Sequence, residues 1–123
     1  MKSSLLRSAV MTAILSAVFV VAANAQTEPM TGGYSNISVT SAEATSAAAV
    51  AVKRHASLHT KDKVTLVRIL KAEQQVVAGM NYRICMIVKN RRGVLRTVTA
   101  VVYQPLKGKK RSTDWQTGEC KEI

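Results

Sequence analysis

The chain has 123 residues, with 18 lysines and arginines against 7 aspartates and glutamates, and its formal net charge is +11. This length suits one small domain and excludes two, while the positive charge favours acidic partners, membranes or nucleic acid. Aromatic residues that could stack on bases are few, and nothing in the chain resembles a nucleic-acid-binding motif. Apart from a run at residues 107–111 the basic residues are scattered, so we interpret the charge as a solvated, soluble surface.

The first 25 residues have the pattern of a secretory signal peptide. Lys2 and Arg7 make a basic start, an apolar run occupies residues 9–22, and Ala23-Asn24-Ala25 offers small residues to signal peptidase. The run is too short, and is followed by too polar a chain, for a transmembrane helix. We therefore expect cleavage after residue 25 and a secreted, extracellular product. Loss of two basic residues from 18 leaves 16 against 7 acidic ones, a mature net charge of +9.

The mature chain is predicted to consist of a flexible N-terminal arm, residues 26–33, and one folded domain, residues 34–123. The arm is polar, contains a proline and ends in Gly32-Gly33. Two residues without side chains allow an extended backbone to lie close against a partner surface. Residues 34–39 predict a short first strand.

A helix is predicted from Ala42 to about Ser57 because this stretch is dense in alanine, the strongest helix former. Thr40 and Glu43 have the spacing of a capping box, with Thr40 as the N-cap. One side of the helix at helical spacing is predicted to pack on a sheet. That side contains Ala44, Ala48, Ala51, Val52 and His55.

Two β-strands, residues 63–70 and 80–88, flank a short connection at residues 75–79. The connection ends in a glycine, which supplies the positive φ that a tight hairpin needs. Its middle is apolar where a turn is usually polar, and we expect Val77 to be the exposed residue at the tip. This hairpin is a candidate contact surface. Its residues are Gln75, Val76, Val77, Ala78 and Gly79.

The pattern Gln75-x-Val77-x-Gly79, followed by Asn81-Tyr82, resembles the first binding hairpin of the cystatins, which inhibit papain-like cysteine proteases. A glycine pair, one helix, this hairpin and two further strands follow one another in cystatin order, from about residue 32 to residue 120. The resemblance implies an α+β, cystatin-like fold in which one α-helix is wrapped by an antiparallel sheet of four to five strands. It also implies reversible, competitive inhibition of papain-like cysteine proteases.

In this resemblance three segments form an apolar wedge that fills a protease cleft: the arm at Gly32-Gly33, the hairpin at residues 75–79 and a second hairpin near Pro105-Leu106. Cystatins usually present a Pro-Trp pair in that second hairpin, and here Leu106 stands in place of the tryptophan. Leucine offers less apolar area and no indole. The single tryptophan, Trp115, lies farther along, and we expect it to pack against the sheet.

After the first hairpin the sequence predicts a turn at residues 90–93, a strand at residues 94–103 and a last strand at residues 112–120. Cys85 and Cys120 would form a disulfide in an exported protein. Simple hairpin registers place the two cysteines on opposite sides of Val98, and strands two apart are separated by roughly 9.5 Å, too far for a bridge. The disulfide therefore requires the last strand to bend over or a bulge to shift its register.

No catalytic constellation is visible, because the chain has no Gly-x-Ser-x-Gly, no Walker loop and no cysteine–histidine pair with a nucleophile's spacing. His55 and His59 are four residues apart, but only Asp62 could complete a metal site nearby. We therefore expect no enzyme, no cofactor and no metal.

The expected partners are papain-like cysteine proteases, not nucleic acid or membranes, and the expected state is a monomer, although cystatin-like domains can swap their first hairpin. Two alternatives stay open. One is a non-inhibitory binding module on the same fold. The other is a cationic antimicrobial or polyanion-binding protein, which the net charge of +9 suggests.

Overall fold

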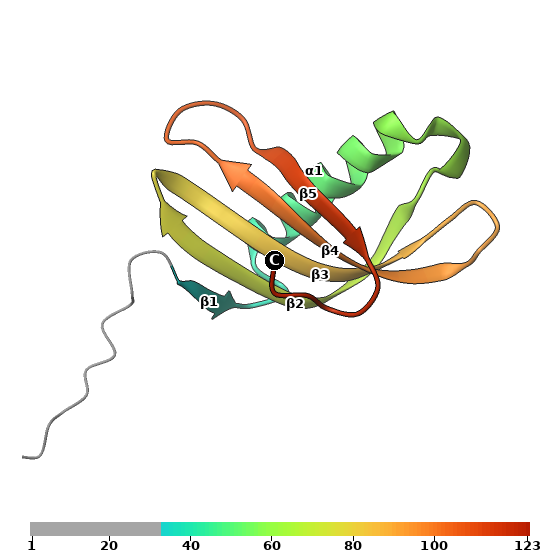
Figure 1. The fold of residues 1–123 in the computed structure, drawn as a ribbon, viewed down its shortest axis with the longest axis horizontal. Helices are drawn as coiled ribbons and strands as arrows, with labels where there is room; N and C mark the ends of the chain where they lie inside the picture. The colour runs from blue at the N-terminus through green and yellow to red at the C-terminus, as the bar shows by residue number, and fades with distance from the viewer. Residues whose placement is uncertain (1–32) are drawn as a thin grey trace, which may run out of the picture.

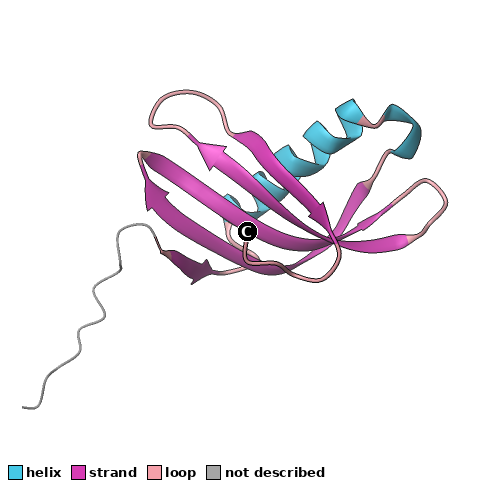
Figure 2. Ribbon diagram, in the orientation of Figure 1, coloured by secondary structure: helices cyan, strands magenta, loops and turns pink. Residues whose placement is uncertain are grey.

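Residues 33–123 form a single five-stranded antiparallel sheet, with the strands in sequence order, and one α-helix that lies across one of its faces (Figures 1 and 2). The structure is a computed structural model and describes residues 33–123, so the predicted signal peptide and the arm up to Gly32 lie outside the described residues. The expected α+β, cystatin-like class is confirmed, with five strands. The elements are β1 (Tyr34–Ile37), α1 (Ala42–Leu58), a 3-10 turn η1 (Thr60–Asp62), β2 (Thr65–Val77), β3 (Gly79–Lys89), β4 (Leu95–Gln104) and β5 (Arg111–Thr117).

Helix α1 has the predicted extent, but its N-cap is Ser41 and not Thr40. The Ser41 hydroxyl accepts a hydrogen bond of 3.1 Å from the backbone N–H of Ala44, which satisfies one of the free donors of the first turn. The Thr40 hydroxyl instead lies 2.9 Å from the hydroxyl of Ser38. Either hydroxyl suits a cap, so sequence alone could not choose between adjacent candidates.

The core lies between α1 and the sheet and is built from small side chains on the helix and larger ones on the strands. Ala44, Ala47, Ala48 and Ala51 are fully buried. Without side chains beyond Cβ, the helix backbone approaches the sheet closely. The largest buried side chains on the facing strands are Ile84, Met86, Val88, Val98 and Val102.

Trp115 packs between the sheet and the helix, as expected. Its indole stacks on the ring of His55, with the ring centroids 4.1 Å apart. The His59 ring stacks on the other face of His55, at 4.2 Å. Burial, and then the neighbouring His59, lower the pKa of His55. The two histidines therefore extend the packing at the end of α1 and do not face a common ligand.

Strand β2 bends around the helix because it carries two irregularities in its pairing with β3. The register shifts between Leu66 and Arg68 and again between Ile69 and Lys71, so each bulge adds one residue that has no partner. Bulges increase the local twist of a sheet, and the strand curves across α1 in Figure 1.

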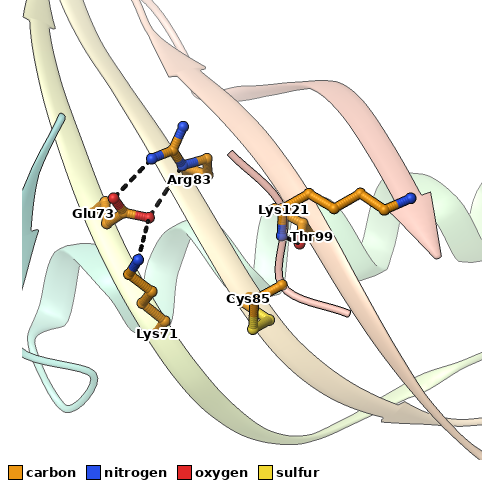
Figure 3. The surroundings of a disulfide bond; sticks show 7 residues. Lys71, Glu73, Arg83, Cys85, Thr99 and Lys121 are labelled. Atoms are coloured by element: carbon orange, nitrogen blue, oxygen red, sulfur yellow. Dashed lines mark hydrogen bonds and ion pairs between the residues drawn. A yellow bond between two sulfur atoms is a disulfide. The ribbon is translucent and has the colours of Figure 1, made fainter. Parts of the chain in front are cut away.

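The last strand is shorter than predicted, and this solves the register problem of the cysteines. Strand β5 ends at Thr117, and the chain then turns at Gly118, where φ is 117°. The following segment folds back over the face of the sheet opposite α1 (Figures 1 and 3) and joins Cys120 to Cys85 in a disulfide with a Cα–Cα distance of 5.4 Å. A bulge in β4–β5 between Val101 and Val102 accompanies this bend, so both of the suggested distortions are present.

Candidate functional site

Three segments that are distant in sequence lie at one end of the molecule: the residue before β1, the turn between β2 and β3, and the connection from β4 to β5 (Figure 1). The sheet register explains why they meet. Tyr34 at the start of β1 pairs with Gln75 near the end of β2, and Met80 near the start of β3 pairs with Gln104 at the end of β4. We call this end, comprising Gly33, residues 75–79 and residues 105–108, the wedge end.

The first hairpin is tighter than predicted. Strand β2 continues to Val77, β3 begins at Gly79, and Val77 and Gly79 face each other in the register, so Ala78 alone forms the apex. Val77 is exposed, as expected, but the apex of the turn is Ala78, one residue later. Val76 is 58% exposed and Val77 is 38% exposed, and because successive strand residues point to opposite faces, both faces of the tip are apolar.

The hairpin is stiffened by a hydrogen bond across the two strands. Gln75 and Asn81 are paired in the register, and the Asn81 side-chain amide donates a 2.9 Å hydrogen bond to Oε1 of Gln75. The two polar residues of the cystatin-like pattern thus brace the base of the tip, while the apolar residues lie beyond them.

Gly79 is required for two reasons. Its φ of 110° is unfavourable for residues with a Cβ, and a Cβ there would lie 2.3 Å from the carbonyl oxygen of Gln104. The Tyr103 hydroxyl donates a hydrogen bond to the carbonyl of Ala78. The end of β4 therefore packs against the turn and stabilises it. The sequence alone did not predict this role for Tyr103 and Gln104. Their position opposite the start of β3 becomes apparent only once the strands are in register.

The second connection holds its own shape through the side chain of Gln104. The Gln104 amide donates hydrogen bonds to the carbonyls of Pro105, at 3.2 Å, and Gly108, at 2.9 Å. Leu106 is 82% exposed beyond this brace, so it is offered to solvent in the place where cystatins usually carry tryptophan.

The third segment is anchored through β1. The Arg83 guanidinium lies over the ring of Tyr34, at 3.9 Å from the centroid, and forms a two-pronged pair with Glu73, at 2.8 and 3.1 Å (Figure 3). The hydrogen bond from Arg83 lowers the pKa of Glu73. Arg83 also donates to the carbonyl of Ile123. Arg83 thus ties the edge strand β1, through Tyr34, and the C-terminal residue Ile123 to the middle of the sheet. Exposed Gly33 leads into β1 at the wedge end.

Within residues 33–123 there is no group of three histidine, cysteine or acidic side chains that could hold a metal ion. In the same part of the chain, none of the helices has the length and apolarity needed to cross a bilayer. The exposed large apolar side chains at the wedge end are those of Val76, Val77 and Leu106, and Lys107 beside them is also exposed. Such a surface is suited to burying apolar area against another protein.

Comparison with known proteins identifies the family. The family model described as a cystatin domain matches residues 32–122, more than half of the chain, and the protein therefore belongs to the cystatin family. A segment of 77 residues is 39% identical to cysteine proteinase inhibitor 8 of Oryza sativa subsp. japonica. This segment covers 62% of the chain and 62% of that relative's length.

Solved structures with the same fold include other proteins of similar size. The crystal structure of a salivary cystatin from the soft tick Ornithodoros moubata superposes with a TM-score of 0.56, at 22% identity, over 72% of this chain and 98% of the tick protein. The crystal structure of Al-CPI superposes with a TM-score of 0.59, at 17% identity, over 71% of this chain and 100% of that one. At these identities the likeness supports the fold and not the function.

Proposed function

We propose that the protein is a reversible, competitive inhibitor of papain-like cysteine proteases and that the wedge end enters the protease cleft. The observation that carries this proposal is the first hairpin. It exposes Val76 and Val77 on opposite faces of a tip whose backbone is held from behind by Tyr103 and Gln104. Membership of the cystatin family, and a relative named as a cysteine proteinase inhibitor, support the choice of partner.

Inhibition by such a surface follows from preorganisation. The tip is braced by the Gln75–Asn81 hydrogen bond and the second connection by Gln104, so little conformational entropy is lost when the loops are ordered in a complex. Fully burying one valine or leucine side chain contributes roughly 1.5–3 kcal/mol. The exposed apolar side chains of Val76, Val77 and Leu106 therefore supply the main favourable term.

The two hairpins are not expected to contribute equally. Leu106 offers a smaller and more flexible apolar surface than an indole. The first hairpin should therefore dominate the affinity, with the Gly32-Gly33 arm and the Pro105-Leu106 tip adding to it. Competition with substrate follows because wedge and substrate would occupy the same cleft.

The compartment and assembly state belong to the same proposal. Export after cleavage behind Ala25 would place the chain in an oxidising compartment, where the Cys85–Cys120 disulfide is stable. We propose that the mature protein, residues 26–123, acts there as a monomer and that it is not an enzyme.

The proposal is tested by adding purified residues 26–123 to papain and measuring hydrolysis of a small peptide substrate at several substrate concentrations. The expected result is a raised apparent KM with an unchanged maximal rate, and recovery of activity on dilution. Absence of inhibition at micromolar protein, or inhibition that substrate does not relieve, would contradict the proposal.

A further inference from the structure

A second concave surface lies between α1 and the beginning of β5, on the helix side of the sheet. It is a groove of about 780 Å³, which is within the range of ligand-binding clefts. One wall is formed by the exposed side of α1 from Ser46 to Ser57, and the other by residues 109–112 together with Gln104. The groove shares Gln104 with the support of the wedge end, but Val76, Val77 and Leu106 do not line it.

In the part of the chain that the structure describes, five positively charged side chains and no acidic one line the groove. The cluster unites the basic run of the second connection with two residues of the helix that lie more than fifty positions earlier in the chain. These five residues, the basic groove, are Lys53, Arg54, Lys109, Lys110 and Arg111.

Among residues 33–123, no carboxylate forms an ion pair with any of these five. The ion pairs found in residues 33–123 join Glu73 to Lys71 and to Arg83, on the other face of the sheet. Two of the groove's cations lie against aromatic rings instead: Lys110 is 5.8 Å from the Tyr82 ring centroid and Arg111 is 5.1 Å from that of Tyr103. Cation–π contacts orient these groups and leave their positive charge uncompensated.

Five like charges around one groove repel each other in the free protein, and the repulsion is relieved when anions enter. A concave surface with low-dielectric walls concentrates the field of its charges. The charge distribution therefore points to a ligand that carries several negative groups close together.

The shape and chemistry of the lining narrow the class of ligand. Charges stand on both walls, so they fit a chain that runs between the walls better than the flat surface of a membrane. Among the described residues, no aromatic side chain on which bases could stack lines the groove. Val50 is the one apolar lining residue in that part of the chain, so the groove offers little apolar contact to a peptide. Ser46, Ser57 and Ser112 also line the groove, and serine hydroxyl groups suit the hydroxyl groups of a sugar chain.

We propose that the basic groove binds a linear sulfated polysaccharide. Arginine and lysine side chains on the two walls would contact sulfate groups on either side of the chain. This site is distinct from protease inhibition and does not depend on it, because none of the five cations belongs to the wedge tips.

The test uses a short heparin oligosaccharide and isothermal calorimetry at several salt concentrations. The triple variant Lys53→Gln, Arg54→Gln, Lys109→Gln removes three charges from exposed positions of the basic groove. The matched control Lys61→Gln, Arg91→Gln, Arg92→Gln removes three exposed charges from a second basic patch beside the β3–β4 turn. Both variants have the same net charge, and equal melting temperatures would show that both are folded.

The expected result is that the groove variant binds the oligosaccharide at least about tenfold more weakly than the unmodified protein, with a shallower salt dependence, while the control changes by less than about threefold. Equal losses in the two variants would overturn the proposal in favour of diffuse charge. An oligonucleotide, a polyglutamate or an anionic vesicle that binds as tightly as the oligosaccharide, with the same dependence on the groove variant, would overturn the assignment to a sulfated sugar.

Discussion

The two ends of strand β3 carry two turns that are stabilised in opposite ways. At the end distant from the wedge, the turn at residues 90–93 is closed by its own side chain: Oδ1 of buried Asn90 accepts hydrogen bonds from the backbone N–H groups of Arg92, at 3.0 Å, and Val94, at 2.9 Å. Gly93 there has a φ of 81° and open space around it. This turn is polar and basic, and the hydrogen bonds of the Asn90 side chain that stabilise it lie within the turn itself.

The turn at Ala78 has no polar side chain of its own and is held by the adjacent hairpin. Tyr103 donates to the Ala78 carbonyl, and Gly79 packs against the backbone of Gln104. A turn that is stabilised by hydrogen bonds within itself needs polar side chains in the turn. A turn that is stabilised by a neighbouring strand can expose apolar side chains instead. The comparison indicates that Val76 and Val77 are exposed because the second hairpin supplies the stability that a polar turn would otherwise provide.

The largest expected difference between the two turns is in the response of their glycines to alanine. Gly79→Ala places a Cβ against the backbone carbonyl of Gln104 at a φ of 110°, and no side-chain rotation relieves that contact. We expect a loss of about 2–3 kcal/mol in unfolding free energy and at least a tenfold loss of papain inhibition. Gly93→Ala meets nothing and should cost about 1 kcal/mol through its positive φ alone, with unchanged inhibition. Denaturant unfolding and inhibition assays measure both, and equal effects at the two sites would refute the comparison.

An aspartate in place of an exposed valine should weaken inhibition at the wedge end but not at the distant turn, and should leave stability nearly unchanged at both. Val76 is 58% exposed and Val94, beside the distant turn, is 48% exposed, so aspartate at either position should shift stability by less than about 0.5 kcal/mol. Val76→Asp should weaken papain inhibition by about 2 kcal/mol, because it brings an unpaired charge into an interface that excludes water. Val94→Asp should leave inhibition unchanged. If both variants inhibit alike, the first hairpin is not the contact.

Asn90→Ala should have the opposite effect to Val76→Asp, because it should lower stability and leave inhibition nearly unchanged. Two backbone N–H groups lose their acceptor when the side chain of Asn90 is removed, and we expect a loss of about 1–2 kcal/mol in stability. Inhibition below the melting transition should stay within about twofold of the unmodified protein. Thermal unfolding followed by inhibition at a fixed low temperature provides the comparison, and a parallel loss of both properties would show that the ends are coupled.

The smallest effect on stability and inhibition is expected from removing the Tyr103 hydroxyl beside the first hairpin. Tyr103→Phe removes the hydroxyl that donates to the Ala78 carbonyl and keeps the ring. We expect a loss of about 1 kcal/mol in stability and about threefold weaker inhibition, because a looser tip loses more entropy on binding. Inhibition that weakens through faster dissociation would agree with this account, whereas an unchanged inhibition constant would show that the hydroxyl does not hold the tip.

The order of elements, the helix and the first hairpin could be predicted because each has a local signal. Alanine density marked α1, and alternating β-branched residues bounded by glycine marked β2 and β3. Details that depend on tertiary packing could not be predicted. The bulges of β2 carry no glycine or proline, and the extent of β2 to Val77 depends on pairing with β3 across a single-residue turn.

The contacts of Tyr103 and Gln104 and the clustering of the basic residues also depend on tertiary packing, so they too could not be predicted from the sequence. Tyr103 and Gln104 became part of the site only through the β3–β4 register. The basic run at residues 107–111 looked isolated in the sequence, and it faces Lys53 and Arg54 only because β5 packs beside α1. Cys120 reaches Cys85 because β5 stops at Thr117 and the chain turns back, an event marked in the sequence by no more than Gly118.

Amide hydrogen exchange of the protein, free and bound to papain, tests most directly the claim that the wedge end and not the distant turn meets the protease. Exchange reports local opening and burial residue by residue. We expect slower exchange on binding at residues 76–80 and 106–108, and no change at residues 90–93. Protection at residues 90–93, or none at the β2–β3 turn while papain is inhibited, would contradict the account.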